Sequence, residues 1–213
     1  MTSDAAGLLT LSQWLSPAFP VSAFAYSGGL EAAVASGAVS DEAAVSDWIG
    51  AVVVAGAARN DAILLCLALR GEMAHPALAD LACALAGSAE RWRETYEQGA
   101  AFARTLAEMG RTLPAAPYPV ALGIAARDLG LPDTLVAQLF LQAQVANLVS
   151  AAIRLVPLGQ AAGQRIIAGL GEQIARVAAE AVVAGPDDLG SATLGAELAA
   201  LEHETLPVRL FRS

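Results

Sequence analysis

The sequence predicts an all-α fold, a single-domain multi-helix bundle with a mobile C-terminal tail. The 213 residues are 56% hydrophobic but only 5% aromatic, so Ala, Val and Leu supply most of the apolar surface. Alanine favours helices and lets their backbones approach closely, whereas sheets prefer branched and aromatic residues. The length suits one sizeable core, and no linker divides the chain. We therefore expect one domain over residues 1–213, with residues 1–6 flexible and residues 205–213 forming the tail.

Proline, glycine and capping residues place the first helices. Ser16-Pro17 stops the first, because a residue before proline avoids the helical conformation. Gly37 ends the second, where a left-handed cap favours glycine. Ser40 is the expected N-cap of the third, with acidic residues following in its first turn. The predicted helices cover residues 8–15, 30–36, a segment beginning after Ser40, 61–71, and a segment beginning at Pro76.

Three later segments have clearer helical patterns. Residues 132–157 are apolar nearly all round, which predicts a central helix. Residues 160–184 predict one amphipathic helix, and residues 88–108 another. In the helix over 160–184 the apolar face is formed by Ile166, Ile167, Leu170, Ile174, Val177 and Ala181. In the helix over 88–108 the predicted apolar face comprises Trp92, Tyr96, Ala103 and Leu106, and the predicted solvent face comprises Glu90, Arg93, Glu94, Glu97, Arg104 and Glu108.

Charge and hydropathy exclude several classes of function. The net charge of −9 disfavours nucleic acid and anionic membranes, because both attract clustered positive charge. All 12 basic residues are arginine, so the chain has no P-loop lysine, no lysine that could form a Schiff base and no lysine general base. The most apolar stretches, 49–69 and 135–156, contain polar and charged residues, which argues against spanning helices. No signal peptide is recognisable. We expect a soluble, cytoplasmic protein that binds neither membrane nor nucleic acid.

Candidates for catalysis or metal binding are few. Cys66 and Cys83 lie in apolar helical runs and are expected to be small buried hydrophobes, with a disulfide or a metal pair as alternatives. His75 precedes a proline at a helix start. His203 has a glutamate on either side, but neighbours on a helix point in different directions and cannot converge on one ion unaided. No hydrolase, zinc-protease or phosphate-loop motif occurs, so we predict no catalytic or metal site.

Two further features have alternative explanations. Gly28-Gly29 either cradles an anion ahead of a helix or, more simply, makes a turn with positive φ. The ending Arg209-Leu-Phe-Arg-Ser213 has an aromatic residue between two arginines. It is either a partner-binding anchor, since aromatic and arginine residues dominate interfaces, or a frayed end.

Three motifs resemble the UreF family of urease accessory proteins. Residues 16–31, SPAFPVSAFAYSGGLE, are similar to the family's SPxLPVGxFxYSxGLE. Residues 150–165, SAAIRLVPLGQAAGQR, are similar to its SAAIRLxPLGQxxGQR. Residues 203–213 resemble its HExxxxRLFRS terminus. The motifs lie in the family's order and together span nearly the whole chain. One departure is Ser22-Ala23, which replaces the usual glycine after Pro-Val.

The resemblance implies a non-enzymatic, all-α homodimer that bridges UreD (also called UreH) and the GTPase UreG and so delivers nickel to apo-urease. It implies no tightly bound cofactor, and nickel passes through the complex. The scarcity of His and Cys favours passage over storage, because Ni(II) prefers imidazole or thiolate ligands. The resemblance assigns UreD binding to His203, Glu204, Arg209, Leu210, Phe211, Arg212 and Ser213. It assigns a UreG-facing or dimer surface to Tyr26, Ser27, Glu31, Arg154, Gln160, Gln164 and Arg165.

Alternatives to the scaffold role stay open. Pro157 and Gly159 make a corner flanked by Arg154 and Arg165, whose guanidinium groups either reach a partner or brace helix ends internally. An inserted arginine can stabilise charge on a transferring phosphoryl group. The alternative function is therefore that of a regulator, which acts on UreG as a GTPase-activating protein or as a checkpoint. A generic helical bundle remains only if the motif matches are coincidental.

Overall fold

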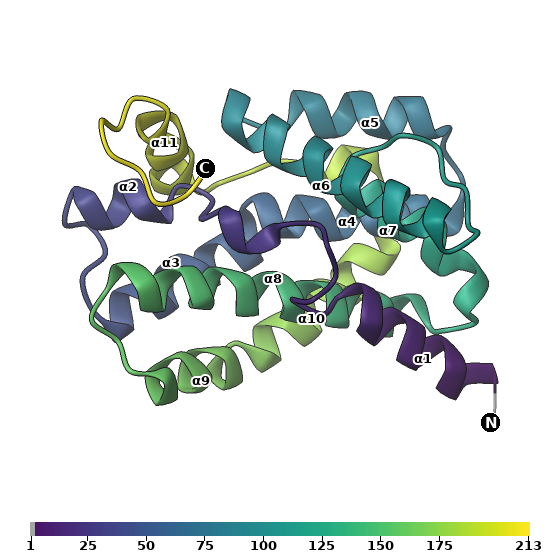
Figure 1. Ribbon diagram of the computed structural model, residues 1–213, viewed down its shortest axis with the longest axis horizontal. Helices are drawn as coiled ribbons and strands as arrows, with labels where there is room; N and C mark the ends of the chain where they lie inside the picture. Colours follow the sequence, from purple (N-terminus) through teal and green to yellow (C-terminus); the bar gives the residue numbers. More distant parts are fainter. Residues whose placement is uncertain (1–2) are drawn as a thin grey trace.

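The computed structural model describes residues 3–213, and within them it is an all-α bundle with no strand (Figure 1). Three short 3-10 turns, at Ala23–Ala25, Arg127–Leu129 and Pro186–Asp188, supplement the α-helices. The α-helices are α1 (Ser3–Trp14), α2 (Leu30–Ala35), α3 (Glu42–Ala55), α4 (Ala57–Arg70), α5 (His75–Ala84), α6 (Ala89–Glu108), α7 (Tyr118–Ala126), α8 (Asp133–Leu155), α9 (Gln160–Gly169), α10 (Gly171–Val183) and α11 (Leu194–His203).

The core is built around α4. Every residue from Asn60 to Leu69 is buried, and α4 contacts α3, α5, α7, α8 and α10. Helix α7 approaches α4 closely, since a Cβ added to Gly123 would lie 2.5 Å from the carbonyl oxygen of Leu65. The predicted central helix, α8, is also a core element, but one of its faces lines a cavity described below. Alanine and glycine therefore pack the helices at short range, as the composition predicts.

Capping predictions are largely confirmed. Gly37 has a φ of 80° after α2, and the consecutive positive φ values of Gly28 and Gly29 confirm a glycine turn. The side chain that caps α3 belongs to Asp41, not Ser40: it accepts a hydrogen bond of 2.9 Å from the amide of Ala44.

Other element predictions are corrected. The helix predicted over 160–184 is two helices, α9 and α10, which meet at Gly169–Gly171. Five of the six residues of its predicted apolar face are buried, and Ile167 is half-buried against the core. Helix α7 was not predicted from the sequence; it carries Pro119 in its first turn, where proline is compatible with a helix. Cys83 is exposed rather than buried, while Cys66 is buried as predicted. Burial raises the pKa of the Cys66 thiol to about 12.

The predicted solvent face of α6 is partly wrong. Glu90 and Glu94 are only 7% and 9% exposed, while Tyr96, assigned to the apolar face, is 46% exposed. The inward face of α6 instead combines these carboxylates with Phe102 and Leu106. Two buried carboxylates need partners, because an unpaired buried charge is costly.

Two helical stretches are long and apolar enough to cross a membrane by length and composition alone, Glu42–Arg70 and Asp133–Leu155. Their most apolar windows are 72% and 44% buried inside the fold. A buried core helix passes the same test, so this finding is weak evidence for a membrane span.

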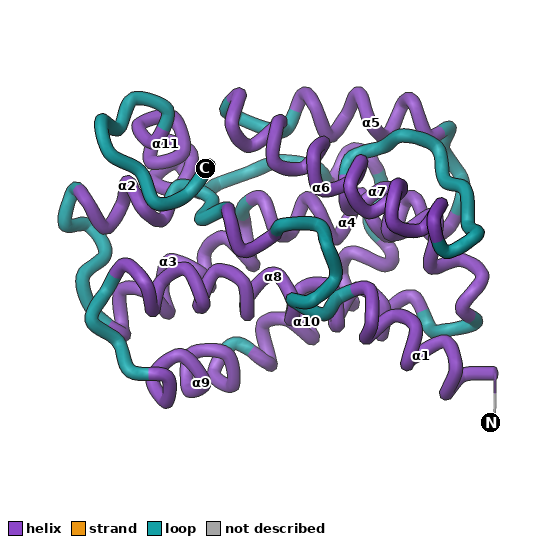
Figure 2. The backbone as a smooth tube through the Cα atoms, in the orientation of Figure 1, coloured by secondary structure: helices purple, strands orange, loops and turns teal. Residues whose placement is uncertain are grey.

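The C-terminal end of the chain differs from the prediction of a mobile tail. Residues 1 and 2 of the expected flexible segment lie outside the described residues, and α1 begins at Ser3. The structure does not show a mobile tail. Figure 2 shows the segment after α11 as a loop that returns past α2 and ends against the body. Phe211 and Ser213 are each only 4% exposed, so the end of the chain is packed.

Candidate functional site: the docked tail

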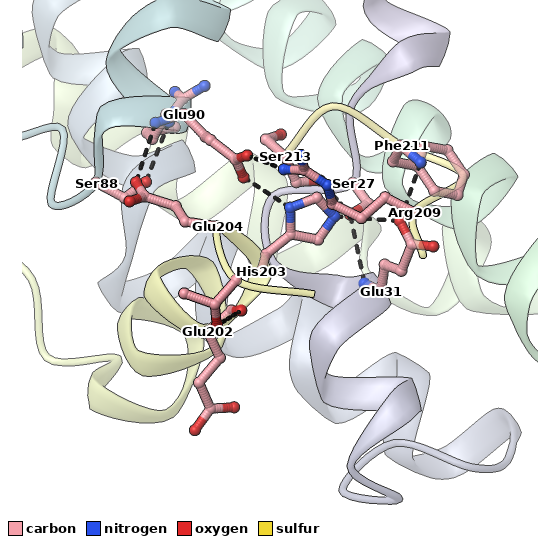
Figure 3. Close-up of polar contacts among 12 residues, drawn as sticks. Ser27, Glu31, Ser88, Glu90, Glu202, His203, Glu204, Arg209, Phe211 and Ser213 are labelled. Atoms are coloured by element: carbon pink, nitrogen blue, oxygen red, sulfur yellow. Dashed lines mark hydrogen bonds and ion pairs between the residues drawn. The ribbon is translucent and has the colours of Figure 1, made fainter. Parts of the chain in front are cut away.

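The site begins with His203, the last residue of α11, which is fully buried. Its Nδ1 lies 2.6 Å from a carboxylate oxygen of Glu90 on α6, and its Nε2 lies 3.1 Å from one of Glu31 on α2 (Figure 3). The imidazole ring is thus held between two carboxylates, one at each of its nitrogens. His203 therefore joins three helices.

Glu31 also holds the tail by its main chain. The amide of Leu210 donates to Oε1 at 2.7 Å, and the amide of Phe211 donates to Oε2 at 2.9 Å. Burial by itself would raise the pKa of Glu31. The two amides and His203 outweigh burial and hold that pKa below its ordinary value. The docked tail therefore favours the ionised carboxylate of Glu31.

Side chains and a short main-chain pairing complete the contact. Arg209 pairs with Glu90, and Arg212 pairs with Glu97 at 3.3 Å. The Ser213 hydroxyl donates to Glu94 at 2.9 Å, and its carbonyl accepts from the Ser27 amide at 2.9 Å. The Ser27 hydroxyl also donates to that carbonyl. We call the five residues that receive the tail the cradle: Ser27, Glu31, Glu90, Glu94 and Glu97.

Phe211 provides the apolar part of the contact. Its ring is covered by the guanidinium of Arg154, whose Cζ lies 4.4 Å from the ring centroid. Arg154 also donates to the carbonyl of Phe24 at 3.3 Å. A cation over an aromatic face is attracted to the ring quadrupole. Arg154 therefore braces the tail internally, and the three motifs found in the sequence meet at this one place.

Tyr26 lies beside the cradle and is buried. Its hydroxyl donates to Glu97 at 2.8 Å. Burial, reinforced by the neighbouring carboxylate, raises the pKa of Tyr26 to about 12. The phenol is therefore neutral near pH 7 and acts as a hydrogen-bond donor.

A cavity of about 290 Å³ adjoins the cradle. Tyr26, Glu94 and Ser213 form part of its wall, and residues of α1, α3, α4, α6, α7, α8 and α11 line the rest together with the loops between these helices. Inside it, Arg91 pairs with Asp61 and with Glu94 at 3.2 Å. Partial burial alone would lower the pKa of Arg91, but the two carboxylates raise it above its ordinary value, so the guanidinium stays charged.

The predicted site residues fall into two groups. The tail residues lie together with Tyr26, Ser27, Glu31 and Arg154. Glu204, the residue after α11, caps α6 by accepting a hydrogen bond of 2.8 Å from the amide of Ala89. The remaining three, Gln160, Gln164 and Arg165, are exposed on α9. Of these, Arg165 pairs with Glu42 at 2.6 Å.

Sequence reasoning missed the glutamates of α6. Glu90, Glu94 and Glu97 follow the i, i+4, i+7 spacing that puts side chains on one helical face. That spacing and the two arginines of the tail are both visible in the sequence. A local pattern cannot show that the two segments pair, because they lie more than 100 residues apart. Among the described residues, no group of three or more His, Cys, Asp or Glu side chains is arranged to hold a metal ion.

Comparison with known proteins gives a consistent result. The family model described as UreF matches residues 39–171. A protein of Jannaschia sp. (strain CCS1) is 58% identical over 208 residues, covering 97% of this chain and 94% of that protein. A protein of Cereibacter sphaeroides (strain KD131 / KCTC 12085) is 58% identical over 209 residues, covering 98% and 99%. One of Paracoccus denitrificans (strain Pd 1222) is 49% identical, covering 98% and 97%. Each is called urease accessory protein UreF.

The helical fold and these relatives define an accessory protein of urease maturation rather than a catalytic enzyme. Such a role implies interaction with other components of that maturation. The chain belongs to the UreF family.

Proposed function

We propose that the chain is a non-catalytic scaffold that bridges UreD (UreH) and the GTPase UreG while nickel is inserted into apo-urease. In this proposal it works as a homodimer in the cytoplasm, and nickel is cargo that it passes on without holding tightly. The scarcity of ligands supports passage, since the whole chain has two histidines and two cysteines.

The proposed UreD contact rests on one observation: the outward side of the docked tail exposes apolar side chains. Arg209, Phe211 and Ser213 turn towards the body, whereas Val208 and Leu210 are 81% and 63% exposed. On α11, immediately before the tail, three leucines at helical spacing are also exposed: Leu194 at 68%, Leu198 at 49% and Leu201 at 46%. Exposed apolar side chains gathered on neighbouring segments are typical of binding surfaces. The inner residues of the tail therefore shape the surface, and the outer residues touch the partner.

The test is co-elution with UreD on size-exclusion chromatography. We expect the full chain to co-elute and the double variant Val208→Asp/Leu210→Asp to lose the partner. The matched control is Val183→Asp, which changes a side chain that is 83% exposed at the end of α10. Co-elution of all three proteins would contradict the tail surface as the contact, while membership of the family would stand.

A regulatory action on UreG is the second candidate. Arg165 supports it, because its side chain is 63% exposed and is held only by a surface pair with Glu42, which contributes little to stability. Such a side chain is free to turn towards a phosphate. Arg154 is less available, since it covers Phe211.

Measuring GTP turnover by UreG separates the two candidates. Stimulation by the wild-type chain that is lost in Arg165→Ala, but kept in Arg176→Ala, would support an inserted arginine. The control Arg176 is likewise exposed and paired on the surface, with Glu180. No stimulation by the wild-type chain would exclude the regulator and leave the scaffold.

A further inference from the structure

The cavity next to the cradle gathers most of the aromatic side chains of a chain that has few. The sequence contains eleven aromatic residues, and seven of them line this one cavity. Besides Tyr26 they are Trp14, Phe19, Phe24, Trp48, Tyr118 and Phe140. An engineered apolar cavity of about 150 Å³ holds benzene, so a volume of about 290 Å³ has room for an aromatic ring with a short substituent.

The charged side chains in the wall of the cavity are mostly acidic. Within the described part of the chain, Asp61, Glu94 and Glu197 line it, whereas Arg91 is the one basic residue that does so. Arg91 pairs with both Asp61 and Glu94, so one guanidinium faces two carboxylates. The formal charge of this group is therefore negative, which favours a cation over a neutral or anionic ligand.

The wall also offers hydrogen-bond acceptors. The side-chain amide nitrogen of Gln98 donates to Glu94 at 3.4 Å, and that of Gln144 donates to Asp61 at 3.0 Å. Because the nitrogen of each amide is held by a carboxylate, its carbonyl oxygen is the end left for another donor. The hydroxyl of Thr95, a residue that is 5% exposed, also lines the cavity and has no hydrogen-bond partner among the described residues. A buried hydroxyl without a partner is costly, so a ligand with N–H groups would satisfy it.

We propose that this cavity binds a small organic cation, a protonated amine with an aromatic or other apolar body. The faces of aromatic rings attract a cation, the acidic excess adds to that attraction, and the amide oxygens accept its N–H groups. A metal ion fits less well, because no three His, Cys, Asp or Glu side chains of residues 3–213 are arranged to hold one. This inference goes beyond the scaffold role and does not depend on it.

The probe is benzylammonium, followed by saturation-transfer-difference NMR on the full-length chain at neutral pH. Benzyl alcohol and benzoate have nearly the same shape but are neutral and anionic. We expect saturable binding of benzylammonium that is at least about tenfold tighter than binding of either analogue. Absence of saturable binding would overturn the proposal. Equal binding of the three compounds would overturn it too, because it would show an apolar cavity that does not recognise charge.

Two substitutions test the place of binding, and circular dichroism checks that each variant is folded. Trp48→Leu removes one aromatic wall and should weaken benzylammonium about fivefold, while Trp92→Leu, at another half-buried tryptophan that lies outside the cavity, should not. Asp61→Asn should weaken it about tenfold, because the acidic excess is reduced. Its control is Asp128→Asn, which removes an exposed carboxylate paired with an arginine elsewhere.

Binding that ignores Trp48→Leu would place the probe outside the cavity and overturn the proposal, even if Asp61→Asn does not fold. Either failure would leave the UreD contact, which is tested by co-elution, untouched.

Discussion

At the scale of single residues, Ser22 is the described non-glycine residue with a positive φ, 60°. A side chain in this left-handed region costs about 1–2 kcal/mol relative to glycine, which adopts it freely. The related family signature has glycine after Pro-Val, and the geometry explains why glycine suits this position.

We expect Ser22→Gly to raise the free energy of unfolding by about 0.5–1 kcal/mol, since the greater freedom of glycine in the unfolded chain offsets part of the relief. Urea denaturation measures the change. Ser40→Gly, at an exposed position without a positive φ, should not stabilise the protein. Equal stabilisation by both substitutions would contradict strain at Ser22.

Arg91 supports a second residue-scale prediction. It pairs with Asp61 and Glu94 next to the cavity, so Arg91→Met leaves two nearly buried carboxylates without their cation. We expect a loss of about 3 kcal/mol in the free energy of unfolding. Arg176→Met, which breaks an exposed pair with Glu180, should cost about 0.5 kcal/mol. Chemical denaturation measures both losses. Similar losses of unfolding free energy in the two variants would show that burial of the ion pair does not determine how much its removal destabilises the protein.

At the scale of elements, the crossing of α4 and α7 depends on Gly123. A Cβ there would lie 2.7 Å from the Cβ of Ala68 as well as close to the Leu65 carbonyl. Gly123→Ala should therefore push the helices apart and destabilise the protein by about 1–3 kcal/mol. Gly169→Ala, with open space around its position, is the control and should be neutral or slightly stabilising. Thermal unfolding of both variants compares them directly.

The elements themselves were predictable where local chemistry sets their ends. Gly37 and Ser88 mark helix ends in the sequence and in the structure, because the cap acts within a few residues. Local chemistry failed for α7, where proline starts a helix, and for the division between α9 and α10. It also failed for the faces of α6. Polar residues there are buried because a distant segment supplies their partners, and no local periodicity reports that.

At the scale of the whole molecule, the docked tail should respond to acid. The pKa of Glu31 is lowered from its ordinary value of 4.5. A lowered carboxyl pKa contributes stability that is fully present above the ordinary value and is lost as the pH falls through the folded value. We expect the amides of Leu210 and Phe211 to lose protection in hydrogen exchange, corrected for intrinsic rates, below about pH 4.5.

The control for this prediction is Glu31→Gln, in which the same amides should be less protected at every pH and should lack the acid step. Amides of α4 should stay protected until the whole protein unfolds, because that helix is buried. Loss of protection in α4 and the tail at the same pH would contradict a separate opening of the tail.

The candidate site was predictable in its parts but not in its arrangement. The sequence motifs named Tyr26, Glu31, Arg154 and Phe211, and the structure brings them together. The sequence could not show that Glu31 receives the tail. Glu31 was assigned to a UreG-facing or dimer surface, separate from the tail, because of the family resemblance and not because of any contact. Pairing across so many residues depends on the tertiary fold.

This separation along the chain also bears on the order of folding. Ser27 and Ser213 are 186 residues apart, and the cradle exists only once α2 and α6 are both held by His203 of α11. Closing so long a loop is entropically unfavourable until intervening structure has formed, so contacts of this kind form late. In refolding, a fluorophore on the tail should therefore report a slower phase than one in α4 and α7. The tail would close last, on an already folded helical body.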